Sequence, residues 1–430
     1  MKAPLPAPQG QARTQSSQPR PKPRSCRICG SDDLELFLSL GDQPHCNRFL
    51  RKEQLSKPEP FYPLDTYFCR GCSLVQLGYT VPPEVMFKDY PYVSGTTRTL
   101  REHFHGFAGR ITSRFKLTAR DLVVDIGSND GTFLKGFQAT GTRVLGIDPA
   151  TDIVRMANKA GVETIEGFFS EELARRVAAS HGKAKTVTAA GVFFHIDDLH
   201  DVLRGVRALL TDDGVFTVQA IYLVDMIEEN SFDNIYHEHL CYYCLGPLMT
   251  LFAMHGMEPF DVERSPIHGG SILLYTRLKR PGAPPREASI TKMLDAERRA
   301  GYHTFQVYRD FASRVARNRD DLRRIVSSLK AQGKRIYAYG APAKGNTLLN
   351  YVGLGPDLIE CATEKNPLKC GYYTPGMHVP VVHEDSVRNA PPDYYLLLPW
   401  NFKEELLEKE QEFRARGGKF IIPIPDPHIV

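Results

Sequence analysis

The sequence predicts an α/β protein with three parts: a small N-terminal metal-binding module and two units in which strands alternate with helices. Three observations support this fold class. Two Cys-x-x-Cys pairs stand near the N-terminus, a strand–glycine turn–helix pattern begins at residue 122, and a second such pattern begins at residue 334. Strands that alternate with helices form a largely parallel sheet covered by helices on both faces.

The composition is that of a globular chain. Of its 430 residues, 42% are hydrophobic and 24% are charged, which is ordinary for a folded protein. No stretch approaches the roughly 18 to 20 apolar residues that a membrane helix needs, and the N-terminus lacks the apolar segment of a secretory signal. Nine cysteines, an odd number, fit a reducing compartment better than a disulfide framework. We therefore expect a cytoplasmic protein with no membrane partner.

Positive charge is concentrated at the N-terminus. Residues 1–25 carry five basic residues and no acidic one, so the remainder has a net charge of −1 although the whole chain has +4. This balance argues against nucleic acid as a partner. The first 24 residues, rich in Pro, Gln and Ser, are predicted to be a disordered tail.

The two cysteine pairs predict a zinc site within a module over residues 25–89. Each pair can place two thiolates on one metal ion, and four thiolates complete a tetrahedral zinc site with no open position for chemistry. A structural role is therefore expected, and two unrelated thiol pairs are the alternative. The expected ligands are Cys26, Cys29, Cys69 and Cys72, which leaves Cys46 unpaired.

The segment from residue 122 predicts a cofactor-binding turn at the start of a unit over residues 90–282. A buried strand turns through two glycines into a helix, and a second strand ends in Asp148. Glycines let a ligand approach the backbone, and an acid at this place accepts hydrogen bonds from ribose hydroxyls. The glycine spacing is not the GxGxxG of NAD-binding proteins. The candidate cofactor-binding residues are Asp125, Gly127, Ser128, Asn129, Gly131 and Asp148.

Two further candidates follow the next predicted strands. Phe168, after the third strand, can stack on an adenine or equally pack in a core. His195 ends the fourth strand, at the edge of a parallel sheet where ligands bind; a lone histidine is otherwise more often structural. An Asp-Asp-Gly turn at 212–214 precedes a fifth strand over 215–220.

The run at 234–239 gathers unusual chemistry in one place. Tyr236, His237, Glu238 and His239 are consecutive, and such a set can supply a base, an orienting group and an oxyanion donor. Flanking apolar residues indicate a partly enclosed site, and a solvated loop is the second interpretation. Zinc binding is weakly indicated, because the histidines are two residues apart, unlike the four of HExxH motifs.

The second α/β unit spans residues 283–430. An amphipathic helix is predicted from Ile290 to Gln332, and a strand, a turn at Gly340 and a helix follow. Backbone amides at a helix start, with Lys344 and Asn346, suit a phosphate; a purely structural turn is the alternative. Two more strands, over 394–398 and 419–422, flank a helix expected over 403–416.

From Ser25 to Val430 the chain resembles the S-adenosylmethionine-dependent C-methyltransferases that act at C3 of TDP-4-keto-deoxysugars. The resemblance rests on the paired Cys-x-x-Cys motifs together with DIGSNDGTFL, YHEH, HGGS, YGAPAKGNTLLNY and GGKFIIPIP. It implies a class I methyltransferase domain with a Rossmann-like sheet, a second Rossmann-like domain that contributes to binding the nucleotide-sugar, and structural zinc. We expect the protein to be a monomer.

The resemblance also implies roles for individual residues. His239 would be the base that removes the C3 proton, Glu238 would orient the site, and Tyr236 would donate to the developing oxyanion. Tyr90 and His195 match further active-site positions. The substrate-binding candidates are Lys344 and Asn346, expected at the phosphates, together with Tyr339 and His268.

The chain departs from the family pattern at two places. Ala190 and Gly191 stand where the family tends to have an asparagine before the Val-Phe segment, and Leu273 stands where it commonly has an arginine. These departures leave open another keto sugar-nucleotide, or transfer to oxygen or nitrogen. A non-catalytic zinc-ribbon interaction protein is the alternative from another class.

Overall fold

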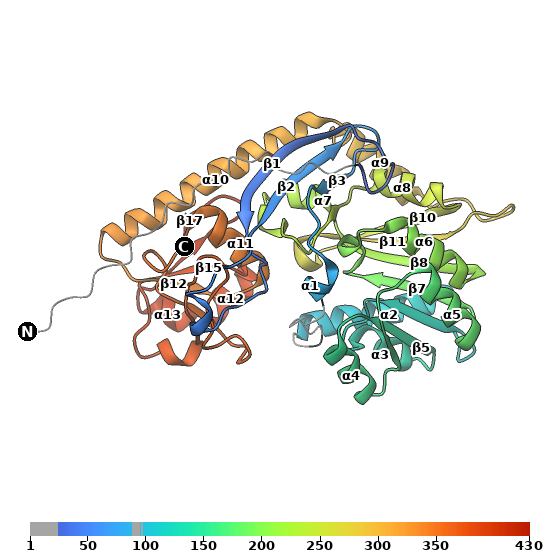
Figure 1. Ribbon diagram of the computed structural model, residues 1–430, viewed down its shortest axis with the longest axis horizontal. Helices are drawn as coiled ribbons and strands as arrows, with labels where there is room; N and C mark the ends of the chain where they lie inside the picture. Colours follow the sequence, from blue (N-terminus) through green and yellow to red (C-terminus); the bar gives the residue numbers. More distant parts are fainter. Residues whose placement is uncertain (1–24, 88–94, 96–97) are drawn as a thin grey trace, which may run out of the picture.

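The computed structural model describes residues 25–87, 95 and 98–430, which form three β-sheets with their helices. Figure 1 shows two lobes, one around each larger sheet, joined along one side by the long helix α10 (Phe305–Ala331) and strands β1 and β2. The tail predicted to be disordered and Tyr90 lie outside the described residues. Within the described part, no helix has both the length and the apolar character needed to cross a bilayer.

The smallest sheet belongs mainly to the zinc module. It consists of β1 (Leu34–Gln43), β2 (Tyr62–Cys69), β3 (Val75–Leu77) and β9 (Cys241–Tyr242), with all neighbouring pairs antiparallel. The last strand comes from the middle of the chain, directly after the Tyr-His-Glu-His run. The sequence analysis missed this pairing, because a two-residue strand has no readable periodicity.

The seven-stranded sheet has the order β10-β11-β8-β7-β4-β5-β6. Strands β4 to β8 pair in parallel, and β11 is antiparallel to both β8 and β10. The expected turn at 212–214 lies inside β8, next to a register shift against β7. The strands are β4 (Leu122–Ile126), β5 (Arg143–Asp148), β6 (Thr164–Glu166), β7 (Ala184–Ala190), β8 (Leu210–Ile221), β10 (Met257–Ser265) and β11 (Ser271–Leu278).

Helices cover this sheet because each carries an apolar stripe. Buried side chains recur at helical spacing in α2, for example Leu100, Phe104, Phe107 and Ile111. The aromatic rings of Phe107 and Phe133 stack with their centroids 5.3 Å apart. The helices of this part are α1 (Pro83–Phe87), α2 (Arg98–Phe115), α3 (Thr132–Gln138), α4 (Thr151–Lys159), α5 (Glu171–His181), α6 (Leu199–Leu209), α7 (Leu223–Glu228) and α8 (Leu245–Met254).

The six-stranded sheet has the order β14-β13-β12-β15-β16-β17, in which only β17 is antiparallel to its neighbour. Counted from β12, this is the 3-2-1-4-5-6 order of Rossmann sheets. Its strands are β12 (Ile336–Tyr339), β13 (Ala362–Glu364), β14 (Val381–His383), β15 (Tyr394–Leu397), β16 (Lys419–Ile422) and β17 (His428–Ile429), and its helices are α11 (Ala343–Val352), α12 (Lys403–Lys409) and α13 (Gln411–Ala415).

Two predicted helices are each divided in the structure. The helix expected from 290 to 332 is α9 (Ala288–Arg299) followed by α10, because Gly301 adopts a left-handed φ of +82° between them. The helix expected over 403–416 is interrupted between α12 and α13. The 27 residues of α10 span about 40 Å. Its predicted apolar stripe packs on the small sheet, where the rings of Tyr308 and Phe68 lie 4.8 Å apart.

Candidate active site

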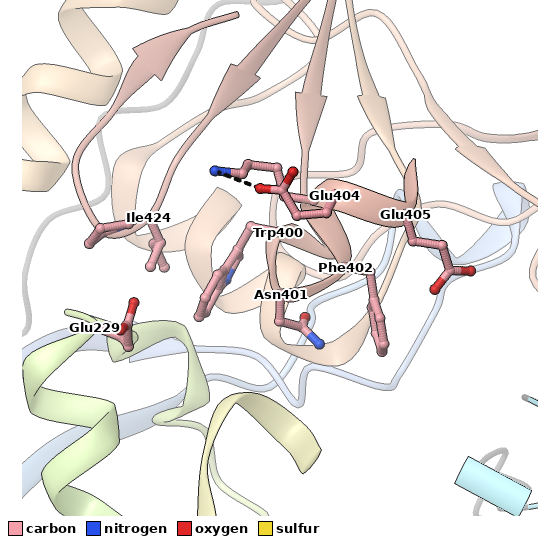
Figure 2. Close-up of a pocket in the computed structure, with 9 residues that line it drawn as sticks. Glu229, Trp400, Asn401, Phe402, Glu404, Glu405 and Ile424 are labelled. Carbon is pink, nitrogen blue, oxygen red and sulfur yellow. Dashed lines mark ion pairs between the residues drawn. The ribbon is translucent and has the colours of Figure 1, made fainter. Parts of the chain in front are cut away.

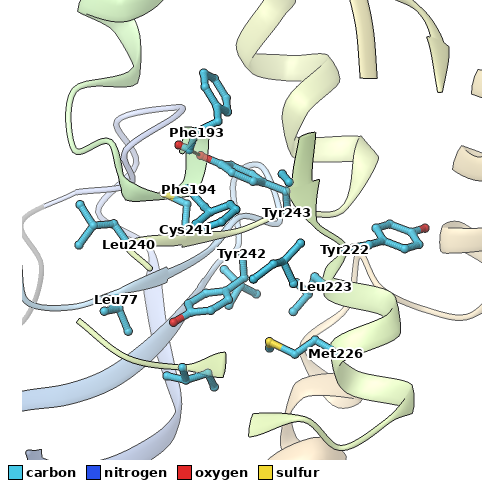
Figure 3. Close-up of a cluster of buried hydrophobic side chains, with 14 of the residues drawn as sticks. Leu77, Phe193, Phe194, Tyr222, Leu223, Met226, Leu240, Cys241, Tyr242 and Tyr243 are labelled. Atoms are coloured by element: carbon cyan, nitrogen blue, oxygen red, sulfur yellow. Dashed lines mark hydrogen bonds between the residues drawn. The ribbon is translucent and has the colours of Figure 1, made fainter. Parts of the chain in front are cut away.

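The Tyr-His-Glu-His run is a buried loop between the 3-10 turn η4 (Phe232–Asn234) and β9. His237, Glu238 and His239 are only 2%, 2% and 4% exposed. The interpretation as a solvated loop is therefore wrong. Figure 3 shows why the loop is enclosed: Leu240, Cys241, Tyr242 and Tyr243, which follow it, pack among apolar residues of the zinc module and of the unit around the seven-stranded sheet, among them Leu77, Phe193, Phe194, Leu223 and Met226.

Backbone hydrogen bonds connect this loop to both neighbouring parts. The Leu77 N–H, in β3, donates to the Leu240 carbonyl over 2.9 Å, and the Leu240 N–H donates to the Phe194 carbonyl over 2.8 Å. The second bond reaches the 3-10 turn η3 (Phe193–His195) that carries His195. The zinc module therefore fixes the position of the loop and, through it, the turn with His195.

His239 has the features of a general base. Its Nδ1 lies 2.8 Å from the Asn234 carbonyl, which can only accept, so Nδ1 carries the proton and Nε2 keeps a free lone pair. Its ring packs against Tyr236 and His195, with centroid separations of 3.9 Å and 5.2 Å. Burial, with a contribution from the charge of His195, lowers the pKa of His239 to about 3. The imidazole is therefore neutral at pH 7.

Glu238 is an ionised carboxylate held by the zinc module. Its Oε1 accepts a hydrogen bond from Asn47 Nδ2 over 2.6 Å and lies 3.2 Å from His45 Nε2. Burial alone would raise its pKa, but the close contact of His45, with smaller contributions from His195 and Asn47, lowers the pKa to about 2. The sequence analysis missed His45 and Asn47. The signal was a polar Pro-His-Cys-Asn stretch that no motif connects with position 238.

His195 lies where the sequence predicted it, beside the buried loop. Burial lowers its pKa to about 4, and its Nδ1 is buried without a hydrogen-bond partner among the described residues. The ring of Phe87 contacts it edge-on at 5.4 Å. Phe87 is the last described residue before the segment that contains Tyr90. The structure therefore brings together His195, Tyr236, Glu238 and His239.

The predicted cofactor turn follows β4 at the edge of the seven-stranded sheet. Gly127 has a φ of +67°, and a Cβ there would lie 2.7 Å from the Val192 side chain; Gly131 has a φ of +77°. Both positions therefore require glycine. Asp148, which ends β5, accepts from the backbone N–H groups of Asn129 and Ala150, each over 2.9 Å.

Asp125 has a different environment from the turn. It is buried within β4 and accepts a hydrogen bond from Thr188 Oγ1, on β7, over 2.5 Å. Burial raises its pKa to about 8. Its carboxyl group therefore bonds across the sheet, next to the turn.

The edge of this sheet fits an adenosine cofactor. Phe168 is 46% exposed although it is a large aromatic side chain, and the hydroxyl of Ser128 is buried without a partner among the described residues. Around Gly191, which follows the neighbouring strand β7, a Cβ would meet open space. Leu273, in contrast, is 1% exposed and packs in the core with Phe260 and Tyr275, so its departure from the family pattern adds an apolar core contact.

The C-terminal lobe contributes a lysine close to the catalytic loop. Lys344 Nζ donates to Asn401 Oδ1 over 2.5 Å and lies 4.2 Å from the centre of the Trp400 ring. Trp400 Nε1 donates in turn to Asp233 Oδ2 over 2.6 Å. Burial lowers the pKa of Lys344, opposed by the charge of Asp233. Figure 2 shows a surface pocket on the outer side of this group, lined by Trp400, Asn401, Phe402 and Glu229 among others.

The other substrate-binding candidates have three different environments. His268, with a φ of +59°, is exposed and close enough to His239 and Lys344 for their charges to interact. Asn346 is buried, and its Nδ2 donates to the Cys46 carbonyl over 2.7 Å. The Tyr339 hydroxyl bonds to Glu410 and Lys409 within a separate aromatic cluster of the C-terminal sheet. Of these candidates, the structure brings His268 towards His239, and Lys344 lies near His268.

The four predicted zinc ligands converge. The sulfur atoms of Cys26, Cys29, Cys69 and Cys72 all lie within 4.8 Å of one another, and the Cys26–Cys72 and Cys29–Cys69 pairs are each separated by 3.5 Å. Four sulfurs around one centre at about 2.3 Å give separations of this size. These four thiolates therefore fit a tetrahedral zinc ion. In the described residues, no other group of three or more His, Cys, Asp or Glu side chains has its ligand atoms close enough together to hold a metal ion.

Comparison with known proteins assigns the three parts. Family models match residues 26–87 ("Putative zinc binding domain"), 100–260 ("Methyltransferase domain") and 266–425 ("C-methyltransferase C-terminal domain"). The C-methyltransferase NovU of Streptomyces niveus is 40% identical over 407 residues, which cover 94% of this chain and 96% of NovU.

Solved methyltransferases are similar to the middle part. A SAM-dependent methyltransferase from Anabaena variabilis is 13% identical and covers 45% of this chain and 100% of its own, with a TM-score of 0.33. The CcbJ methyltransferase of Streptomyces caelestis is 13% identical, covers 46% of this chain and 96% of its own, and has a TM-score of 0.33. Scores this low add no argument about function.

The fold and the family matches define an S-adenosylmethionine-dependent methyltransferase with a zinc-binding module. More particularly, the chain belongs to the C-methyltransferase family that includes NovU. The expected family, fold class and cofactors are confirmed at this level. The alternative of a non-catalytic interaction protein is wrong, because the family is one of enzymes.

Proposed function

We propose that this enzyme methylates C3 of a nucleotide-linked 4-keto-deoxysugar, such as a TDP-sugar, with His239 as the base. The observation that carries the proposal is the environment of His239. Its Nδ1 proton is bound to the Asn234 carbonyl, its Nε2 is free to accept a proton, and the ionised Glu238 is its neighbour in sequence. A buried neutral imidazole beside an anion suits the removal of a proton from carbon.

The chemistry of the substrate makes this proton removable. A ketone at C4 acidifies the C3–H bond, because the electron pair left on carbon is delocalised onto the ketone oxygen as an enolate. His239 Nε2 takes the proton, and the negative charge of Glu238 stabilises the imidazolium that forms. Tyr236, whose ring packs on His239, would donate a hydrogen bond to the developing oxyanion.

The cofactor site would be the turn after β4, with Gly127 for close approach, Asp148 at the ribose and Phe168 at the adenine. S-adenosylmethionine supplies a methyl group on a sulfonium sulfur, which is an electrophile for carbon. Lys344 supports the choice of an anionic substrate, because its cation lies near His268, which in turn lies near His239. Its lowered pKa, caused by burial, indicates that a negatively charged ligand would stabilise the charged form.

Solvent exchange at the substrate carbon tests this function. Protein would be incubated in D₂O with a TDP-4-keto-deoxysugar, with and without S-adenosylmethionine, and the sugar analysed by mass spectrometry. We expect one deuterium at C3 without the cofactor and one additional carbon-bound methyl with it. Absence of both, from protein shown to bind the cofactor, would mean another substrate or transfer to oxygen or nitrogen.

The variant His239→Asn isolates the base. We expect exchange and methylation to fall by about 10²- to 10⁴-fold, the range of general base catalysis, with nearly unchanged affinity for S-adenosylmethionine. His181→Gln, at the exposed end of α5, is the matched control and should retain both activities. Exchange at the wild-type rate in His239→Asn would remove His239 as the base.

A further inference from the structure

The segment Pro44–Asn47, which follows β1 in the zinc module, reaches the catalytic loop. Pro44, His45 and Cys46 are buried and Asn47 is partly buried. A loop rich in polar side chains normally lies at the surface, where water satisfies its hydrogen bonds. Here the polar groups of the segment are directed at one partner, Glu238.

Three side chains of the segment lie against one oxygen, Oε1, of the Glu238 carboxylate. Asn47 Nδ2 donates to Oε1 over 2.6 Å, His45 Nε2 lies 3.2 Å from Oε1, and Cys46 Sγ donates to Oε1 over 3.7 Å. His45 and Glu238 are 8% and 2% exposed. A buried carboxylate is stable only with such partners, because water is excluded from its oxygens.

The segment is held on its other side by the C-terminal lobe. Asn346, in the first turn of α11, donates to the Cys46 carbonyl over 2.7 Å. Leu50 and Tyr373 exchange two backbone hydrogen bonds, of 2.9 Å and 2.8 Å. The segment therefore cannot move away from Glu238 without breaking contacts to a second part of the molecule.

We infer that His45 and Asn47 are positioning residues for Glu238, which keep its carboxylate ionised and oriented beside the two buried histidines of the active site. This inference rests on the proposed function, in which the charge of Glu238 stabilises the imidazolium that forms on His239. Neither residue is required to touch substrate. Among the described residues, the titratable groups that interact with Glu238 include His45, Cys46, His195, His237 and His239.

The physical consequence concerns the proton transfer. When a donor to Glu238 is removed, the buried carboxylate regains the full effect of desolvation, so it rotates or takes up a proton. The imidazolium that forms on His239 then lacks a correctly placed counter-charge. Proton removal from substrate should slow, while the binding of cofactor, which we assign to the turn after β4, should not change.

The test uses full-length Asn47→Ala and His45→Ala, with His45→Gln as the conservative variant that can retain a donor. His378→Ala is the matched control, because His378 Nε2 bonds to Glu59 Oε2 over 3.0 Å and so forms a second histidine–glutamate contact of the zinc module, here with the C-terminal lobe and away from Glu238. We expect the rate of C3 exchange and kcat to fall about 10- to 100-fold, as for losses of outer hydrogen-bond partners at metal sites. KM for S-adenosylmethionine and zinc content should not change, and His45→Gln should recover part of the rate.

A second readout needs no substrate. Difference infrared spectroscopy at about pH 5 detects a protonated carboxyl group by its carbonyl stretch, and Glu238→Gln assigns the band, because it disappears from the corresponding double variant. We expect the band in Asn47→Ala and His45→Ala but not in the wild type or His378→Ala. This readout decides the positioning role even if the wild type exchanges no sugar, an outcome that would overturn only the proposed substrate.

Two results would overturn the inference. One is a folded Asn47→Ala or His45→Ala protein whose infrared spectrum shows Glu238 still ionised as in the wild type. The other is exchange within about twofold of the wild-type rate in both variants, since a lost counter-charge should cost at least tenfold. An equal loss of activity in His378→Ala would mean that the variants act through general stability.

Discussion

The seven-stranded and six-stranded sheets share one local arrangement, a glycine turn after the first parallel strand and an acidic residue at the end of the next. In each, the first strand of the parallel set ends in a glycine turn, Gly127 after β4 and Gly340 after β12, and the next strand ends in an acid, Asp148 or Glu364. The Asp148 carboxylate accepts from the Asn129 N–H over 2.9 Å, and the Glu364 carboxylate accepts from the Ala341 N–H over 3.2 Å. In both sheets the acid ties the second strand back to the turn after the first.

The two turns differ in the charge around them. Glu364 has Lys369 Nζ at 4.0 Å, and the same ammonium donates to the Ala341 carbonyl over 2.9 Å. Lys344 lies in the first turn of the following helix. Asp148 has no ion-pair partner among the described residues. One scaffold therefore presents an acidic edge, suited to ribose hydroxyls, and a basic one, suited to phosphates. The fold alone does not choose the ligand; the few charged side chains at the turn do.

Zinc removal should show the largest effect and should distinguish the two lobes. Structural zinc contributes about 10 to 16 kcal/mol of apparent binding free energy in small domains, and the zinc sheet pairs with β9 beside the catalytic loop. We expect chelation to increase amide hydrogen exchange at Leu240–Tyr242 well before it does so at Ile336–Tyr339, measured by mass spectrometry. Unchanged exchange at Leu240–Tyr242 after proven zinc release would contradict the structural role of the metal.

Neutralising Asp148 should weaken the binding of S-adenosylmethionine, whereas neutralising Glu364 should not. For Asp148→Asn we expect the Kd of S-adenosylmethionine to rise about 10- to 100-fold, because a hydrogen bond to a charged group is worth about 1.5 to 3 kcal/mol. Glu364→Gln is the matched variant in the other sheet and should leave that Kd unchanged. Isothermal titration calorimetry measures both. Equal losses in the two variants would mean that the acids serve only to hold their turns together.

The lysine of the second turn should matter for the sugar-nucleotide and not for the cofactor. For Lys344→Met we expect KM for the nucleotide-sugar to rise about tenfold or more, the loss of one charge-assisted contact. KM for S-adenosylmethionine should remain as in the wild type. Lys159→Met, at the exposed end of α4, is the control. Steady-state kinetics with each substrate varied in turn measures both KM values. A change confined to the KM for S-adenosylmethionine would mean that Lys344 contacts the cofactor and not the nucleotide-sugar.

Acid should weaken the first lobe more than the second. Burial lowers the pKa of His237 to about 4, whereas in the unfolded chain a histidine titrates near 6.5. The stabilising effect of the neutral imidazole is therefore complete above pH 6.5 and is lost as the pH falls towards 4, by up to about 1.4 kcal/mol per pH unit for one histidine. Urea unfolding between about pH 7 and 5 should show a smaller slope for His237→Gln. His428→Gln, on the exposed β17, should keep the wild-type slope.

Local sequence patterns were sufficient for most of the architecture. The buried run at 122–126, the glycines after it and the acid at 148 predicted strand, turn and strand correctly, because each residue acts through its own backbone preference or through near neighbours. The convergence of the four cysteines was also predicted from a local pattern, because two Cys-x-x-Cys pairs are the spacing typical of a zinc site. Where the preference was weak, as at Gly301 and around 410, continuous helices were predicted and interrupted ones formed.

The candidate site divides in the same way. The chemistry of Tyr236–His239 is legible in the residue types, and so is the basic turn at Lys344. The burial of the loop could not be predicted from the sequence, and neither could the contacts of Asn47 with Glu238 or of Asn346 with Cys46. The residues of each pair are distant in sequence, and a polar residue in a loop follows no periodic pattern from which a buried partner could be predicted.

The sequence by itself determined the family, the two α/β units, the zinc ligands and the residues able to transfer a proton, because these depend on residue type and short-range spacing. Only the tertiary structure decided that the zinc sheet takes its last strand from beside the Tyr-His-Glu-His loop, that Glu238 is held by the zinc module, and that Tyr339 lies in a separate cluster while Lys344 lies near His268. These outcomes depend on how three separately readable parts pack against one another, and packing joins residues that no local pattern relates.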